Sequence, residues 1–343
     1  MVKPQIQNLQ VFRGFAAIAV VVHHAAISTE AFVGALPVWV AALFNMGFLG
    51  VDFFFVLSGF IIMYAHKDDA RTSTTVKRYA FKRLTRIYPA YLPIGIGLLI
   101  LYAAIPSFSA AGGRDYSLAS SLFLIPADGP PALSVAWTLV HELMFYGIFL
   151  LFFVSARWLA CGLLAWAIMI IVANQWVVLT GWLRYPLSLL NIEFMFGVSA
   201  AWLVGLKGLR GKGLWVALVG VLIALLALLL MTQHKMPYLR LMFAMGLAIL
   251  IVGFTVREQM GGGRWPSLLL FLGSASYSIY LIHTPLLSVT QRAFGRLGFT
   301  WPTAMVFGVL LSLLLGWMYY LMVERPVLRR VQNFFKSPRH GHA

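Results

Sequence analysis

Two ionisable residues of the first apolar segment, Arg13 and His24, have a spacing that suits joint chemistry. Eleven residues turn a helix through three turns plus about 20°, so both side chains project from one face, roughly 16 Å apart along the axis. A neutral imidazole accepts a proton near neutral pH, and a guanidinium at a membrane surface is a natural anchor for a phosphate. The pair therefore predicts a proton-accepting group within a membrane and a phosphate-binding cation at its surface. His23 points about 100° away and is interpreted as structural.

Ionisable residues also interrupt later apolar segments: Asp52, Glu142 with its neighbour His141, Glu193 and His283. A charged group near the centre of a bilayer costs several kcal/mol, so each of them is a candidate functional residue. Asp52 could receive a proton, orient the His24 imidazole or bind a hydroxyl group, and Glu142 lies too deep to be a surface residue. The alternative for each is an internal pair that holds helices together.

A basic segment ends with Arg83 and Arg86, just before Pro89. Residues three apart share a helix face. Such arginines commonly anchor the cytoplasmic side of a membrane protein and do nothing more. Together with Arg13 on the same side, they could instead clamp a ligand that carries several phosphates.

Late in the chain, Ser276, Tyr280 and His283 follow one another along one helical stripe. Hydrogen bonding between helices is the favoured interpretation of this stripe. Tyr280 could alternatively donate to an oxyanion.

Membrane-spanning helices must position these residues, because the composition excludes a soluble globular protein. Of 343 residues, 61% are hydrophobic and only 10% are charged, with a mean hydropathy of +0.86, whereas soluble domains carry about 25% charged residues. At about 20 residues per helix, the chain has room for about ten spans and for no separate soluble domain. The single cysteine, Cys161, cannot form an intramolecular disulfide.

Hydropathy predicts an all-α polytopic protein of about ten transmembrane helices. We expect residues 1–324 to form a membrane-embedded domain and residues 325–343 a short basic cytoplasmic tail. The first apolar run ends in His23-His24 without a convincing cleavage site, which favours a retained helix over a signal peptide. The longest connections are 66–89, which is basic, and 107–134. The predicted spans are 11–29, 43–65, 90–106, 135–154, 158–176, 187–206, 213–232, 241–256, 266–287 and 302–323.

The net charge of +16 would favour a nucleic-acid partner in a soluble protein. Here it indicates orientation, and we expect no nucleic-acid partner. If ten helices alternate in direction, all but six of the 26 basic residues fall on the side of the two termini. The positive-inside rule then predicts that both termini are cytoplasmic. The six on the other side are Arg114, Arg184, Lys235, Arg240, Arg292 and Arg296.

These motifs, in their order along the chain, resemble the acyltransferase 3 family of integral-membrane acyltransferases. His141 departs from the family pattern, which more often has a small or acidic residue before the glutamate. Residues 6–14 are most similar to stand-alone bacterial exopolysaccharide acetyltransferases. The segments that carry the resemblance are Arg13-Gly14 with His24, Gly50-Val51-Asp52 with Phe55 to Phe60, Arg83 with Arg86-Ile87 and Pro89, Trp137-Thr138-Leu139 with Glu142 and Phe145-Tyr146, Tyr277 to Pro285, and Glu324-Arg325-Pro326.

The resemblance implies an O-acyltransferase of the bacterial inner membrane. Such an enzyme takes an acyl group, usually acetyl, from cytoplasmic acyl-CoA and delivers it to a hydroxyl of a carbohydrate, such as an exopolysaccharide or surface glycan, free or lipid-linked. The resemblance implies that His24 is catalytic and that Arg13, Arg83 and Arg86 bind acetyl-CoA. We expect no metal. Asp52 and Glu142 are candidates for orienting the imidazole or the sugar, and substrate or oxyanion contacts are assigned to Tyr280, His283 and Glu193.

Two mechanisms and two other functions remain as alternatives. His24 either removes the hydroxyl proton during attack on the thioester or is itself acetylated. A proton-coupled transporter or flippase of glycan precursors would use the buried acids and histidines as a relay, and it predicts inverted halves and broken helices. A structural partner in a polysaccharide export complex would tolerate replacement of His24 and Asp52.

Overall fold

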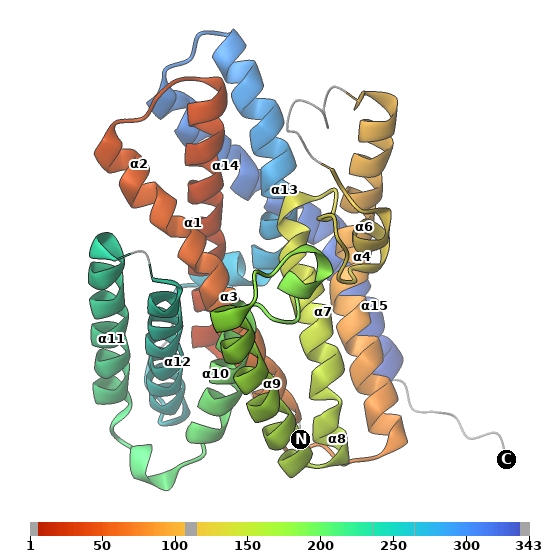
Figure 1. Ribbon diagram of the computed structural model, residues 1–343, viewed down its shortest axis with the longest axis vertical. Helices are drawn as coiled ribbons and strands as arrows, with labels where there is room; N and C mark the ends of the chain where they lie inside the picture. The colour runs from red at the N-terminus through yellow and green to blue at the C-terminus, as the bar shows by residue number, and fades with distance from the viewer. Residues whose placement is uncertain (1–5, 107–114, 235, 264, 337–343) are drawn as a thin grey trace, which may run out of the picture.

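The computed structural model describes residues 6–106, 115–234, 236–263 and 265–336 (Figure 1). These residues form helices, and the described part of the chain contains no strand, which confirms the all-α prediction. The helices are α1 (Gln7–Phe32), α2 (Val38–Asn45), α3 (Leu49–His66), α4 (Ser73–Ala104), α6 (Leu118–Phe123), α7 (Trp137–Phe149), α8 (Leu151–Val154), α9 (Ala156–Trp176), α10 (Leu190–Leu203), α11 (Gly213–Gln233), α12 (Pro237–Gln259), α13 (Ser267–Arg296), α14 (Trp301–Tyr319) and α15 (Arg325–Lys336).

Within the described ranges, nine helical segments are long and apolar enough to cross a membrane. Each corresponds to one of the predicted spans. The tenth predicted span, 187–206, is the shorter apolar helix α10 of 14 residues. The nine are Gln7–Phe32, Val38–His66, Ser73–Ala104, Ser134–Val154, Ala156–Trp176, Gly213–Gln233, Pro237–Gln259, Ser267–Arg296 and Trp301–Val331.

The packing of α1 against α13 shows that α10 also counts as a crossing of the bundle. Gly273 approaches the Gln10 carbonyl and Gly295 approaches the Phe32 carbonyl, so the two helices run parallel. Helices that alternate in direction are parallel only when an odd number of spans separates them. Six long spans lie between α1 and α13, and α10 makes the number odd. In agreement, α1 begins and α15 ends toward the same end of the bundle (Figure 1).

Helix α4 begins well before the predicted span, because much of the expected basic connection is helical. The Thr72 hydroxyl caps the helix by accepting a hydrogen bond from the backbone N–H of Thr75 at 3.3 Å. The helix then continues through Pro89 and Pro93. Prolines are tolerated inside membrane helices where neighbouring groups satisfy the backbone. Arg83 and Arg86 consequently project from a rigid helix and not from a loop.

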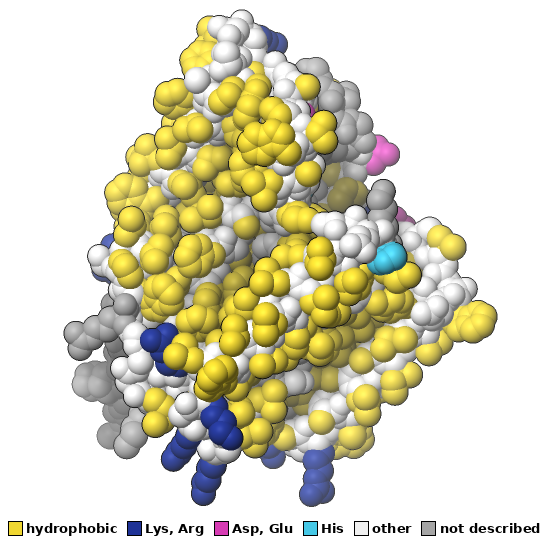
Figure 2. Space-filling view, turned by 90° about the vertical axis from the view of Figure 1, so that its left-hand side faces the viewer, with side chains coloured by type: hydrophobic (Ala, Val, Ile, Leu, Met, Phe, Trp, Pro, Cys, Tyr) yellow, Lys and Arg dark blue, Asp and Glu magenta, His cyan; other side chains and the backbone are white. Residues whose placement is uncertain are grey.

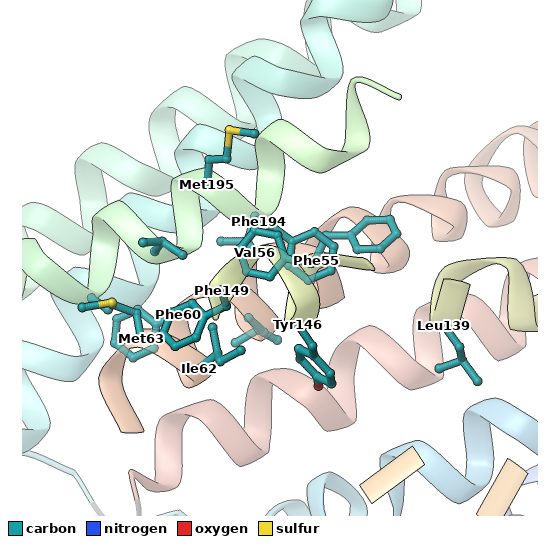
Figure 3. Close-up of a cluster of buried hydrophobic side chains, with 14 of the residues drawn as sticks. Phe55, Val56, Phe60, Ile62, Met63, Leu139, Tyr146, Phe149, Phe194 and Met195 are labelled. Atoms are coloured by element: carbon teal, nitrogen blue, oxygen red, sulfur yellow. The ribbon is translucent and has the colours of Figure 1, made fainter. Parts of the chain in front are cut away.

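A core of aromatic side chains joins α3, α7 and α10 (Figure 3). The ring of Phe194 lies 4.4 Å from that of Phe145 and 4.8 Å from that of Phe55, measured between centroids. Gly59 of α3 and Gly197 of α10 let these helices approach until their backbones touch, as small residues do in membrane bundles. This core forms one wall of the cavity described below.

The outer surface is apolar, as a multi-pass membrane protein requires. Figure 2 shows one face covered with hydrophobic side chains, and Lys and Arg side chains gather at its lower end. Exposed leucines recur along α11 at Leu214, Leu218, Leu222, Leu225 and Leu229.

Candidate active site

One cavity lies among α1, α3, α4, α7 and α13 and encloses about 960 Å³, its open mouth included. All three arginines predicted to bind phosphate, Arg13, Arg83 and Arg86, line this arginine cavity, as do Glu142 and Tyr280. The remaining lining residues are Val51, Phe54, Phe55, Leu57, Ser58, Ile61, Ile87, Thr138, Leu139, Tyr146, Phe194 and Tyr277.

The three arginines differ in how far the protein itself neutralises them. Arg86, which is half-buried, donates to the buried carboxylate of Glu324 in an ion pair. Arg83 donates from Nη2 to Nε2 of His66 at 2.9 Å, and its guanidinium lies 5.3 Å from the centre of the Tyr146 ring. Arg13 makes no hydrogen bond or ion pair with any residue that the structure describes. Arg13 is therefore the arginine best placed to bind a phosphate group.

Glu142 lines the arginine cavity, whereas His24 lines a different one. Its Oε1 atom accepts hydrogen bonds from the Tyr146 hydroxyl and, at 3.4 Å, from the Ser58 hydroxyl. The charges of Glu142 and Glu324 lie close enough to act on Arg13. Two carboxylates therefore balance part of the positive charge of this cavity.

His24 pairs with His283 across the contact between α1 and α13. The two rings lie 5.0 Å apart between centroids, and His24 Nδ1 is 3.3 Å from His283 Nε2. His283 Nδ1 lies 2.6 Å from the Tyr280 carbonyl, which can only accept, so this nitrogen carries the proton and Nε2 is the acceptor. His24 Nδ1 lies 3.0 Å from the Val20 carbonyl, also an acceptor. Neutral His24 is accordingly protonated at Nδ1, and its basic nitrogen is Nε2.

His24 lines a second cavity, between α1, α4 and α13, which we call the hydroxyl cavity. No Asp or Glu occurs among the described residues that line it, and its one cation besides any protonated His24 is Arg292. Hydroxyl groups reach it from Ser28, Tyr102, Ser134, Thr284 and Ser288, and apolar surface from Ile27, Ala31, Phe32, Leu98, Leu101, Ala132, Leu133, Pro285 and Val289.

Tyr280 connects the two cavities through direct contacts. It lines the arginine cavity, and its carbonyl binds His283, which in turn contacts His24 in the hydroxyl cavity. Its hydroxyl lies 3.0 Å from the Thr138 hydroxyl and 3.2 Å from the Val135 carbonyl, so it already has partners within the protein. Ser276, the third residue of the predicted stripe, bonds the Gly273 carbonyl of its own helix.

Asp52 and Glu193 form a separate buried cluster with Arg240 of α12. Arg240 binds both Asp52 oxygens, from Nε and Nη2, each at 2.9 Å. The Glu193 carboxyl is buried and lies close enough to Asp52 for the two carboxyl groups to interact. The structure thus brings these two predicted site residues together.

Sequence reasoning missed the partners of the predicted residues. Arg240 was counted among the loop cations, although it stands only three residues after the start of α12, and it binds an aspartate 188 residues away. Glu324 belongs to the motif Glu324-Arg325-Pro326, to which the sequence assigns no role. The sequence also gives no reason to single out His66, the partner of Arg83. Arg240 and Glu324 each lie one residue outside a predicted span, and the helices of the structure, Pro237–Gln259 and Trp301–Val331, include them.

Comparison with known proteins agrees with this architecture. Residues 6–321 match the acyltransferase domain family Acyl_transf_3. The exopolysaccharide production protein ExoZ of Rhizobium meliloti (strain 1021) is 32% identical over 298 residues, which cover 84% of this chain and 91% of that protein. The acyltransferase MdmB of Streptomyces mycarofaciens is 26% identical over 370 residues, covering 95% of this chain and 92% of that protein. Among solved structures, none matches the chain.

The helical bundle and these matches define a multi-pass membrane enzyme that transfers acyl groups. The chain belongs to the acyltransferase 3 family, as its motifs predicted. No group of three or more His, Cys, Asp or Glu side chains suited to a metal ion occurs in the described part of the chain.

Proposed function

We propose that this acyltransferase moves an acetyl group, or another acyl group, from acyl-CoA to a hydroxyl of a carbohydrate. The observation that carries the proposal is the arrangement of the two cavities, one basic and one rich in hydroxyls, on either side of the contacts from Tyr280 through His283 to His24. The similarity to ExoZ, an exopolysaccharide production protein, supports a carbohydrate acceptor.

The arginine cavity is assigned to the donor. Arg13 would bind a phosphate of the CoA nucleotide, with Arg83 beside it, since charge-assisted bonds to arginine suit phosphate geometry. Arg86 is already neutralised by Glu324 and would help to hold the cavity in shape. The pantetheine arm would run along the apolar lining toward Tyr280, and the roughly 16 Å rise from Arg13 to His24 is comparable to its reach.

The reaction follows from the tautomer of His24. Nε2 accepts the proton of the acceptor hydroxyl as the oxygen attacks the thioester carbonyl, and His283 holds the ring through Nδ1. The carbon–sulfur bond breaks, and the proton passes from Nε2 to the departing CoA thiolate. In the variant with an acetylated imidazole, a single turnover with acetyl-CoA alone would trap acetyl on the protein.

The proposed orientation places both termini and the arginine cavity on the cytoplasmic side of a bacterial inner membrane. Residues 1–324 would then be the catalytic membrane domain, and the basic segment from 325 onward would lie at the cytoplasmic surface, where residues 337–343 fall outside the described part of the chain. This places acyl-CoA, a cytoplasmic metabolite, on the side where Arg13 and Arg83 lie.

The test replaces His24 by Ala in the full chain and measures acetylation of the cell's glycans by mass analysis. Loss of a general base lowers the reaction rate about 10²–10⁴-fold. We therefore expect the acetylated glycan to disappear while the protein remains abundant. His23→Gln is the matched control, because His23 is adjacent and lines neither cavity. Retained acetylation in His24→Ala would overturn the proposal.

A second arm tests the donor cavity by equilibrium binding of acetyl-CoA to the purified protein. Arg13→Gln should weaken binding about tenfold or more, as expected for loss of one charge-assisted bond. Arg78→Gln, an exposed arginine of α4 outside the cavity, should leave binding unchanged.

A further inference from the structure

The hydroxyl cavity is lined by two helical stripes that run in the same direction. On α1 the stripe is His24, Ser28 and Phe32, and on α13 it is Thr284, Ser288 and Arg292. Each steps by four residues, which keeps its side chains on one face. Both stripes begin beside the histidine pair and end together, where the Arg292 guanidinium lies 4.3 Å from the centre of the Phe32 ring.

Arg292 has no counterion among the described residues of this cavity. No Asp or Glu occurs among its described lining residues, and Nε of Arg292 is buried without a hydrogen-bond partner. A buried donor without a partner is destabilising, and more so when it is charged. In the proposed orientation Arg292 also lies on the external side, where the positive-inside rule gives no reason for an arginine.

We infer that the hydroxyl cavity holds an acceptor that carries a negatively charged group, and that Arg292 binds this group. The inference rests on the proposed function, because it takes the hydroxyl cavity as the acceptor site. A carboxylate or a phosphate oxygen would supply the missing partner of the guanidinium, and the Phe32 ring holds the guanidinium in place.

The length of the two stripes separates the anionic group bound by Arg292 from the acceptor hydroxyl that reacts at His24. From His24 to Phe32 the helix rises about 12 Å. The anionic group therefore belongs to a different part of the acceptor from the hydroxyl that His24 deprotonates. This geometry fits an oligosaccharide that bears an acidic sugar, or a sugar joined to a carrier phosphate, and it does not fit a small neutral alcohol.

The test measures binding of three probes to the full chain in lipid nanodiscs by saturation-transfer NMR. The probes are methyl β-glucoside, which is neutral, methyl β-glucuronide, which carries a carboxylate, and glucose 1-phosphate. We expect at least one charged probe to bind about tenfold or more tightly than the neutral one. A preference between the two charged probes indicates which anion the acceptor carries, and either preference supports the inference.

Substitutions connect this preference to Arg292. Arg292→Gln should abolish the advantage of the charged probes, and Arg292→Lys, which keeps the charge, should retain part of it. Arg296→Gln removes an exposed arginine one turn later, outside the cavity, and should have no effect. Equal binding of charged and neutral probes to the unmodified protein, or an unchanged preference in Arg292→Gln, overturns the inference.

Acetyl-CoA binding in the same nanodiscs separates this inference from the proposed function. If acetyl-CoA binds and the probes are not distinguished, the inference fails and the acyl-CoA assignment stands. If acetyl-CoA does not bind, the proposed function fails, whatever the probes do.

Discussion

His283 Nε2 lies 3.3 Å from His24 Nδ1, although the two histidines are 259 residues apart in sequence. Their helices run parallel to each other. Because the Tyr280 carbonyl fixes the proton on Nδ1 of His283, its Nε2 can only accept. His283 and the Val20 carbonyl therefore both favour the tautomer of His24 that is protonated at Nδ1.

Replacing His283 by Phe should lower kcat about tenfold or more and leave KM for acetyl-CoA unchanged. The substitution removes one acceptor of His24 Nδ1 but leaves the Val20 carbonyl in place, so some correctly oriented imidazole remains. Steady-state kinetics of acetyl transfer check this. An increase in KM with normal kcat would instead place His283 in donor binding.

The pair of Arg86 and Glu324 should be essential for stability. Removing one partner leaves a charge in a buried setting, which costs about 3–5 kcal/mol. Arg86→Gln and Glu324→Gln should each lower the unfolding temperature in detergent, and the double variant should recover part of the loss. If the double variant is less stable than both single variants, the charges do not stabilise each other.

Asp52 should be a stabilising residue and not a catalytic one, because Arg240 occupies both of its oxygens. Asp52→Asn should lower the unfolding temperature, because it removes the charged partner of Arg240, whose side chain is 34% exposed. The protein that remains folded should have a kcat within about threefold of the unmodified enzyme. Loss of a proton-transfer group would lower kcat much further, by about 10²–10⁴-fold. Asp52→Asn with a normal unfolding temperature and a hundredfold lower kcat would show that Asp52 takes part in the chemistry.

Gly273→Ala should disrupt the contact that aligns the two histidine helices. A Cβ at this position would collide with the Gln10 carbonyl, and overpacking of this kind costs about 1–3 kcal/mol or more. Thermal unfolding and acetyl transfer should both decline. Gly97→Ala is the matched control in α4, where an added Cβ meets no atom within 4 Å, and equal effects of the two substitutions would contradict the role of this contact.

Long apolar runs made the spans predictable, because about 20 such residues have few alternatives to a membrane helix. The start of α4 was missed because Pro89 suggested a boundary, and the neighbouring helices that accommodate this proline are not visible in its local sequence. The three arginines that line one cavity were predicted as a group because Arg83 and Arg86 are three residues apart and Arg13 shares their predicted side.

The partners within the site could not be predicted, because they are distant in sequence. Asp52 pairs with Arg240 and Arg86 pairs with Glu324 only through the packing of helices, and local periodicity carries no information on such contacts. A single sequence identifies which buried charges need partners, and the fold decides which partner each one receives.

The contact between α1 and α13 also imposes an order on biosynthesis. α1 is synthesised well before Gly273 and His283, the residues of α13 that pack against it. The backbone N–H of Asn8 likewise donates a hydrogen bond, at 3.0 Å, to Glu258, which is synthesised much later than Asn8. A nascent chain must therefore keep Arg13 and His24 in the bilayer before their surroundings exist, and a prematurely terminated chain cannot contain an assembled histidine pair.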